Sequence, residues 1–114
     1  MSAPPGASSA LDESYNCPYI QQMRYVWDPA KAEANLAEHG VSFAEAVTVL
    51  EDDFALTRED PDSQGEQRFV TLGMSSFANL LVVVYTYREA DGIRIISAWK
   101  ANRRQRLRYE QDRR

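Results

Sequence analysis

The sequence predicts an α+β domain in which a short N-terminal strand and two helices precede a largely antiparallel sheet and a C-terminal helix. Three observations predict this fold class. Two capping signals open helices early in the chain, an apolar run at residues 80–85 indicates a strand buried on both faces, and Asp91-Gly92 joins that strand to the next as a hairpin. The chain has 114 residues, which allows one hydrophobic core.

Residues 1–22 have neither a helical nor a strand period, so we expect a disordered N-terminal extension before a single domain at residues 23–114. The extension lacks the basic and apolar regions of a secretory signal. Cys17 is the only cysteine, which excludes an internal disulfide and fits a reducing compartment. The longest apolar run is too short to cross a bilayer. We therefore expect a soluble, cytoplasmic protein.

The first elements follow from local signals. Residues 24–27 have the composition of a short strand, and Asp28-Pro29 then opens a helix that Gly40 closes. The apolar stripe predicted on this helix consists of three alanines, Ala30, Ala34 and Ala37. Its polar face carries Lys31, Asn35 and Glu38.

A second helix begins with the capping box at residues 42–45 and runs to about Leu50. The acidic segment that follows, Glu51-Asp52-Asp53, is interpreted as a solvated turn. Strands are then predicted at residues 54–57, 68–72, 80–85 and 93–99, with a loop at 61–65 and a turn at 73–79. The last helix begins near Asn102, which caps it with the help of Gln105. The expected order is β-α-α-β-β-β-β-α.

The formal net charge of −4 conceals an asymmetry along the chain. Between Asp28 and Asp91 there are 13 acidic and 4 basic residues, whereas between Gly92 and Arg114 there are 8 basic and 2 acidic residues. An acidic protein is a weak candidate for binding nucleic acid, but a basic segment attracts phosphate. The C-terminal segment is therefore where a functional site is expected.

The last helix carries its cations at the end where they destabilise it. Arg103 and Arg104 lie in the first turn, at the positive end of the helix dipole, which costs up to about 1 kcal/mol for each. Arg104 and Arg108 lie four residues apart and repel each other. One interpretation is a solvated basic face that balances the acidic half of the protein. The other is a phosphate-binding surface that includes Arg103, Arg104, Arg106 and Arg108.

Strand alternation extends this surface to the preceding strand. Residues 94, 96, 98 and 100 should share one face, so that Arg94 and Lys100 lead toward the helix start, where backbone N–H groups favour an anion. Trp99 falls on the other face, either as a core residue or as a platform on which an unpaired base stacks. Arg68 reaches the face of Arg94 if the two strands are close, and otherwise pairs with a loop carboxylate.

The residue types present exclude several mechanisms. His39 is the only histidine, which excludes a two-histidine ribonuclease, and the clustered ligands of a zinc site are absent. There is no Gly-rich phosphate loop and no Gly-x-Ser-x-Gly sequence. We expect neither a metal nor a cofactor. A lone histidine before a C-terminal glycine is more often a cap or surface residue than a catalyst, although the helix dipole there favours its protonated form.

Arginines can nevertheless support cleavage of RNA. A guanidinium does not transfer protons at neutral pH, but it binds phosphate oxygens and stabilises the extra charge of a pentavalent transition state. The nucleophile would be the RNA 2′-hydroxyl. Proton transfer would fall to one of four residues, among which the sequence does not choose: His39, Lys100, Tyr109 or Glu110.

Five separated motifs, in order from Arg24 to about Glu110, resemble the BrnT family of toxins. They are Trp27-Asp28-Pro29-Ala30-Lys31; Asn35 with His39-Gly40-Val41-Ser42-Phe43; Glu66 with Arg68-Phe69; Arg94-Ile95-Ile96-Ser97-Ala98; and Lys100-Ala101 with Arg103 and Tyr109-Glu110. Each motif is weak alone, and the resemblance is specific because all five agree.

The resemblance implies a RelE-like fold and a ribosome-independent ribonuclease, the toxin of a type II toxin–antitoxin system, which inhibits translation and growth. It also implies neutralisation by a ribbon-helix-helix antitoxin of the BrnA type, which dimerises and represses its own operon, so a heterotetramer is expected. Carried over residue by residue, it points to a catalytic set of His39, Arg68, Arg94, Lys100 and Arg103. The RNA-binding residues expected are Trp99, Arg104, Arg106, Arg108 and Tyr109.

Two positions depart from the family pattern. Glu38 stands where the family commonly has a lysine and Trp99 where it commonly has an arginine, so each removes a positive charge from the expected site. The alternative function is therefore a weakened nuclease that still binds an antitoxin and acts mainly in autoregulation of the operon. A third possibility, unrelated to toxins, is a structural domain whose basic face balances its own acidic half.

Overall fold

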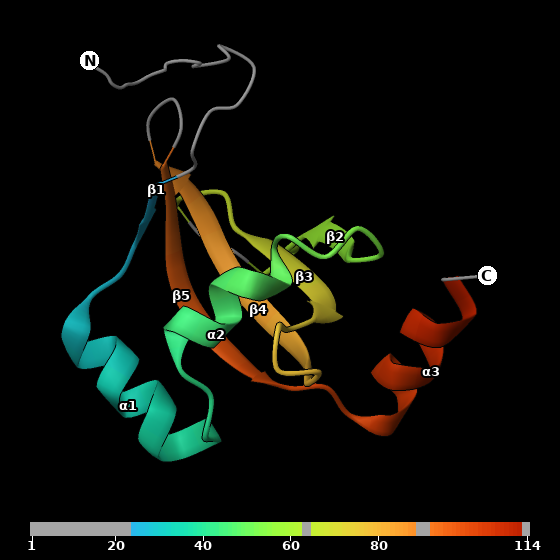
Figure 1. The fold of residues 1–114 in the computed structure, drawn as a ribbon. Coiled ribbons are helices and arrows are strands. Elements are labelled where there is room, and N and C mark those ends of the chain that lie inside the picture. Colours follow the sequence, from blue (N-terminus) through green and yellow to red (C-terminus); the bar gives the residue numbers. More distant parts are fainter. Residues whose placement is uncertain (1–23, 63–64, 89–91, 113–114) are drawn as a thin grey trace, which may run out of the picture.

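Five strands form one sheet in the order β1-β5-β4-β3-β2, and helices lie against both of its faces (Figure 1). The computed structural model describes residues 24–62, 65–88 and 92–112. The elements are β1 (Arg24–Val26), α1 (Pro29–His39), α2 (Phe43–Val49), β2 (Leu56–Glu59), β3 (Phe69–Met74), β4 (Leu80–Arg88), β5 (Gly92–Lys100) and α3 (Arg103–Asp112). The predicted order and the α+β class are confirmed.

Some predictions lie outside the described residues. They concern the extension at residues 1–22, the residue Asp91 of the hairpin turn, and part of the loop predicted at residues 61–65. Within the described part of the chain, no helix is long and apolar enough to cross a membrane.

The helix ends are fixed by the side chains that the sequence predicts. The Asp28 carboxylate accepts the Ala30 N–H at 3.0 Å, and Ser42 Oγ accepts the Glu45 N–H at 3.1 Å. Gly40 closes α1 in the left-handed conformation, with φ of 71°. At α3 the capping box is reciprocal, because Asn102 and Gln105 each accept the backbone N–H of the other at 2.8 Å.

β4 is the middle strand, as its two-sided apolar pattern predicts, and it pairs antiparallel with β3 and β5. The pairing of β1 with β5 is parallel and covers three residues. The strands on either side of the 61–65 loop begin later than predicted. Residues 54–55 form a turn instead, because Asp52 Oδ1 accepts the Phe54 N–H at 3.0 Å.

β3 extends through Gly73, which was predicted to begin a turn. Gly73 packs closely against the end of α2 and the turn after it: a Cβ atom there would stand 3.0 Å from Val49 Cγ1 and 3.1 Å from Ala55 Cβ. The chain therefore reverses only after Met74, between Ser75 and Asn79, where the Ser75 N–H donates to the Asn79 carbonyl at 2.8 Å.

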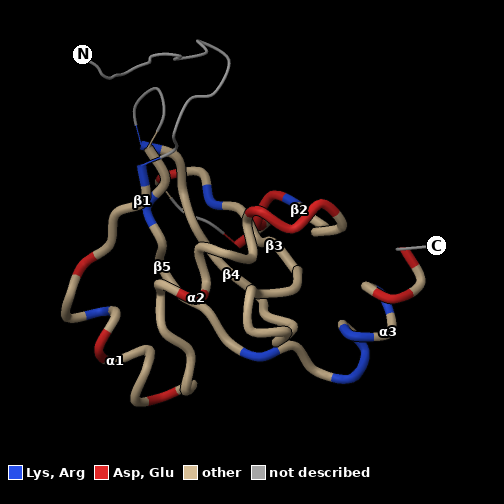
Figure 2. Tube along the Cα trace, viewed as in Figure 1, with Lys and Arg blue, Asp and Glu red and all other residues tan. Residues whose placement is uncertain are grey.

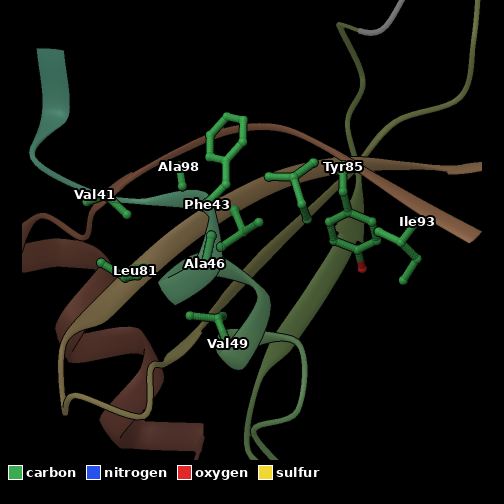
Figure 3. Close-up of a cluster of buried hydrophobic side chains, with 10 residues drawn as sticks. Val41, Phe43, Ala46, Val49, Leu81, Tyr85, Ile93 and Ala98 are labelled. Atoms are coloured by element: carbon green, nitrogen blue, oxygen red, sulfur yellow. The ribbon is translucent and has the colours of Figure 1, made fainter. Parts of the chain in front are cut away.

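The two faces of the sheet carry separate cores. Between the sheet and the helices α1 and α2 lies the larger cluster, shown in Figure 3, which includes Phe43, Ala46, Val49, Leu81, Tyr85, Ile93 and Ala98. On the opposite face, beside α3, lies a smaller cluster of Leu72, Leu80, Val82 and Tyr109. We call the first the helix-covered face and the second the α3 face.

The alanine stripe predicted for α1 is wrong as a buried face, because Ala30, Ala34 and Ala37 are exposed. The buried residue of α1 is Asn35, which lies against the edge of β5. Its Nδ2 donates to the carbonyls of Ala98 at 2.8 Å and Val41 at 3.0 Å, and its Oδ1 accepts from the Ala98 N–H at 3.2 Å and from Ser97 Oγ at 3.1 Å. A polar side chain thus joins α1 to the sheet.

A bulge in β5 changes the predicted alternation. Val84 faces Ser97 and Tyr85 faces Ile95, so Ile96 is an extra residue without an opposite partner in β4. Before the bulge Arg94 lies opposite Thr86, and after it Lys100 lies opposite Leu81. Residues 81 and 86 of a regular strand point to opposite faces. Arg94 and Lys100 therefore do not share a face, which corrects the prediction.

Candidate functional site

The α3 face of the sheet collects arginines from separate strands. Arg58 of β2 lies opposite Val70 of β3, and Val70 packs against the smaller core on this face. Arg94 of β5 lies opposite Thr86 of β4, which shares its face with the buried Val82 because the two are separated by four residues. Both guanidinium groups therefore belong to the α3 face.

Arg68 belongs to the same face. The residue after it, Phe69, packs against the helix-covered core and stacks on Tyr85 with ring centroids 5.9 Å apart, so alternation directs Arg68 to the other side. The Arg68 carbonyl accepts the Asp60 N–H at 2.8 Å, which continues the pairing of β2 with β3. Arg68 and Arg94 are thus placed on one face, on either side of β4, while their catalytic roles remain predictions.

The guanidinium of Arg68 contains an unsatisfied donor. Its Nε is buried and has no hydrogen-bond partner among the residues that the structure describes. A buried donor without a partner costs about 1–3 kcal/mol, and more when it is charged. An oxygen of a bound anion would satisfy such a donor.

α3 supplies further arginines beside this face. Arg104 and Arg108 line a hollow of about 260 Å³ together with Arg58, and four apolar side chains of the sheet, with Thr57 and Gln105, form the rest of its wall. Arg103 and Arg106 do not line this hollow and are exposed on α3. In Figure 2 one basic segment lies at the end of β5 and another at the start of α3, with uncharged chain between them, whereas acidic residues dominate around β2.

Tyr109 anchors α3 rather than facing solvent. It is 2% exposed, and its hydroxyl donates to Asp52 Oδ2 at 2.6 Å. The same oxygen accepts the Met74 N–H at 2.8 Å, so one carboxylate holds both the helix and the end of β3. The prediction that Tyr109 contacts RNA does not fit this position. The interpretation of Asp52 as part of a solvated turn is also corrected.

His39 and Trp99 lie together beside the C-terminal end of β5. Their ring centroids are 6.1 Å apart, and His39 Nε2 is 4.0 Å from Glu38 Oε1. Trp99 is half-buried against the smaller core, so it is partly a core residue, as one of the two interpretations held. The next residue, Lys100, is exposed and lies on the helix-covered face of the sheet.

The five predicted catalytic residues therefore fall into two groups. Arg68 and Arg94 lie at one end of the α3 face, whereas His39, Lys100 and Arg103 lie around the junction of β5 and α3. Trp99, which lies beside His39, marks the position of the second group on β5. At about 3.3 Å per strand residue, it is separated from Arg94 by roughly 15 Å along the strand. The two groups therefore lie at successive positions along β5, where one extended chain can contact both.

The tyrosines whose pKa is shifted lie away from the arginines of the α3 face. Burial raises the pKa of Tyr25 above its ordinary value, with a smaller contribution from the Glu51 charge, and burial likewise raises the pKa of Tyr87. Tyr87 lies opposite Ile93 on the helix-covered face, away from the arginines. Within residues 24–62, 65–88 and 92–112, no three His, Cys, Asp or Glu side chains are grouped so as to hold a metal ion.

Arg58 was not singled out from the sequence, because it stands in the acidic half of the chain. A signal was nevertheless present. In the short strand Leu-Thr-Arg-Glu, Arg58 is two residues from Leu56, and alternation places it on the same face as that apolar residue. Asp52 had no comparable signal, because its partners Tyr109 and Met74 are distant in the sequence.

Comparison with known proteins agrees with these observations. The family model for the ribonuclease toxin BrnT of type II toxin–antitoxin systems matches residues 27–105. Among solved structures, the chain is similar to the ribonuclease toxin BrnT of Brucella abortus, with a TM-score of 0.55 and 21% identity, over 72% of this chain and 100% of that chain. This likeness supports the fold alone. No curated protein matches the chain by sequence. Because the family model covers more than half of its residues, the chain belongs to the BrnT family of ribonuclease toxins of type II toxin–antitoxin systems.

Proposed function

We propose that this chain is an endoribonuclease toxin that cleaves RNA without a metal ion and thereby inhibits translation and growth. The observation that carries the proposal is the α3 face, where Arg58, Arg68 and Arg94 point the same way and the Arg68 Nε lacks a partner among the described residues. Guanidinium groups in such an arrangement suit phosphate oxygens, which they bind in a bidentate manner.

In the proposed reaction a ribose 2′-hydroxyl attacks the neighbouring phosphorus, and the 5′-oxygen of the next nucleotide leaves. The products are a 2′,3′-cyclic phosphate and a 5′-hydroxyl. One proton leaves the attacking oxygen and one reaches the departing oxygen. Arg68 and Arg94 would hold the non-bridging oxygens and stabilise the charge that develops in the pentavalent transition state.

The proton-transfer residue is proposed to be one of His39, Lys100 and Glu110. Tyr109 is less suited, because its hydroxyl proton is donated to Asp52. Alanine substitution of each candidate identifies the residue. The proton-transfer residue is the one whose replacement lowers kcat, leaves KM unchanged and removes one limb of the pH–rate profile.

The test is to incubate the purified chain, freed of antitoxin and in the presence of EDTA, with total RNA beside the variant Arg94→Ala/Arg103→Ala. Cleavage by the parent and none by the folded double variant is the expected result. Equal cleavage by both would place the site elsewhere or indicate a contaminating nuclease. If the parent does not cleave, the nuclease proposal fails.

We further propose that a ribbon-helix-helix antitoxin of the BrnA type neutralises the chain in the cytoplasm by covering the arginines of the α3 face. Two toxins bound to one antitoxin dimer would form a heterotetramer. Light scattering of the co-expressed pair measures the mass of this complex. In cells, we expect expression of the toxin alone to arrest growth. Co-expression of a short adjacent reading frame for such an antitoxin should relieve the arrest.

A second candidate function rests on the surroundings of His39. Both residues that depart from the family pattern lie beside it: Glu38 at 4.0 Å and Trp99 at 6.1 Å between ring centroids. A carboxylate and an indole there replace two positive charges that would attract RNA. The alternative is an antitoxin-binding module that acts mainly in autoregulation. Gain of cleavage in the variant Glu38→Lys/Trp99→Arg, with none by the parent, would favour it.

A further inference from the structure

The hollow between α3 and the sheet combines an apolar floor with a basic rim. We call its apolar sheet residues Val70, Leu72 and Val82 the floor, and Arg58 from β2 with Arg104 and Arg108 from α3 the rim. Leu56, Thr57 and Gln105 complete the lining. The volume of about 260 Å³ lies just below the range of pockets that bind drug-sized molecules. The space suits a group of about the size of one nucleotide.

Within the part of the chain that the structure describes, one ion pair involves the arginines around the hollow. Among the described residues, Arg58 and Arg104 form no ion pair, and Arg108 pairs only with Asp112, its neighbour one turn further along α3, at 3.4 Å. A solvated basic surface has no need of an apolar floor, and an apolar pocket has no need of three cations. A ligand that presents both a flat apolar group and a negative charge satisfies both features.

The hollow is continuous with the proposed site. Arg58 and Val70 form one row across the sheet, Thr86 and Arg94 form the next row on the same face, and Arg68 directly precedes β3 at that level. Adjacent rows on one face are two residues apart, or about 7 Å. A chain whose phosphate lies between Arg68 and Arg94 therefore carries its neighbouring nucleotide toward the hollow.

We infer that this hollow is a nucleotide subsite of the proposed ribonuclease, in which a base lies on the floor of Val70, Leu72 and Val82 and Arg58 binds the adjacent phosphate. The inference rests on the proposed function and adds a residue and a position to it. The occupant is single-stranded RNA because the subsite continues the row of Arg68 and Arg94, and because a stacked base in a duplex cannot lie on the floor.

The test measures binding of a 2′-O-methyl oligonucleotide, which cannot be cleaved, at several salt concentrations. Arg58→Ala should weaken binding about 10-fold and reduce the slope of log K against log salt by about 0.7, the value for one lost contact with a single strand. Lys31→Ala removes one positive charge from α1, in the layer that covers the other face, and should leave both quantities unchanged.

A scan with oligonucleotides that lack one base locates the subsite. At one position, removal of the base should weaken binding to the parent more than binding to Arg58→Ala, since the base contact and the neighbouring phosphate contact are coupled. If the parent binds and cleaves RNA but Arg58→Ala and Lys31→Ala have the same affinity and salt slope, the subsite alone is overturned. A parent that neither binds nor cleaves RNA would overturn the proposed function as well. If Arg58→Ala weakens antitoxin binding but not RNA binding, the hollow belongs to the antitoxin and the inference is wrong.

Discussion

Replacement of Tyr109 by phenylalanine removes one hydroxyl group and tests how α3 is held on the sheet. Tyr109 is the buried residue of this ten-residue helix, and its hydroxyl donates to Asp52 at 2.6 Å. The phenyl ring keeps its packing, and Asp52 Oδ2 keeps the Met74 N–H, so the change isolates one hydrogen bond to a carboxylate. Bonds of this type contribute about 1.5–3 kcal/mol.

A loss of about 2 kcal/mol corresponds to a roughly 30-fold increase in the population with α3 detached. Helices of this length are not stable in isolation, and the arginines in the first turn weaken this one further. The cost should therefore appear as local opening of α3 while the sheet stays folded. Hydrogen exchange is the assay: amides of residues 107–112 should exchange about 30-fold faster, while those of β4 keep their rates.

Tyr87→Phe is the matched control, because it removes a hydroxyl from an exposed tyrosine on the other face of the sheet. It should leave exchange in α3 unchanged. The reasoning is refuted if Tyr109→Phe lowers protection equally in α3 and β4, because α3 would then open only with the whole domain. Unchanged exchange in both elements would show that the hydroxyl does not hold the helix.

Three further predictions concern stability. Asn35→Ala leaves the buried N–H and carbonyl of Ala98 without partners and should lower the free energy of unfolding by about 3 kcal/mol, seen as a lower urea midpoint at constant m. Gly92→Ala should cost about 1–3 kcal/mol in thermal denaturation, because its Cβ would stand 2.6 Å from the Arg88 carbonyl oxygen; no loss would mean that the hairpin adjusts freely. Burial raises the pKa of Tyr25 and Tyr87, so the folded state favours the neutral phenols. Their contribution to the free energy of unfolding is therefore complete below pH 10 and is lost as the pH rises through the raised pKa values. Denaturation between pH 8 and 11 should show a smaller alkaline loss for Tyr25→Phe/Tyr87→Phe than for the parent.

The order of elements could be predicted from the sequence because its signals are local. Asp28, Gly40, Ser42 and Asn102 act on backbone groups within a few residues, and the apolar run of β4 reports its own two-sided burial. Such signals do not depend on which strand lies beside which.

The placement of the site residues depended on contacts that no local pattern contains. Nothing in Ile95-Ile96-Ser97 marks Ile96 as a bulge, because a bulge is defined by the register of two strands. One extra residue was enough to move Lys100 to the other face from Arg94. Arg58 and Arg104 are likewise neighbours only because α3 folds back over the sheet. The sequence predicted which arginines were unusual more successfully than which of them lie together.

The contact of Asn35 with β5 also affects how the protein behaves toward other chains. β1 is so short that it covers only the beginning of β5, which leaves the rest of that strand at the edge of the sheet. An uncovered edge offers free N–H and carbonyl groups on which a strand from another molecule can be added. The Asn35 amide occupies the N–H and the carbonyl of Ala98 on that edge, as a residue of an added strand would. One side chain on α1 therefore makes this edge a poor template for intermolecular β-pairing.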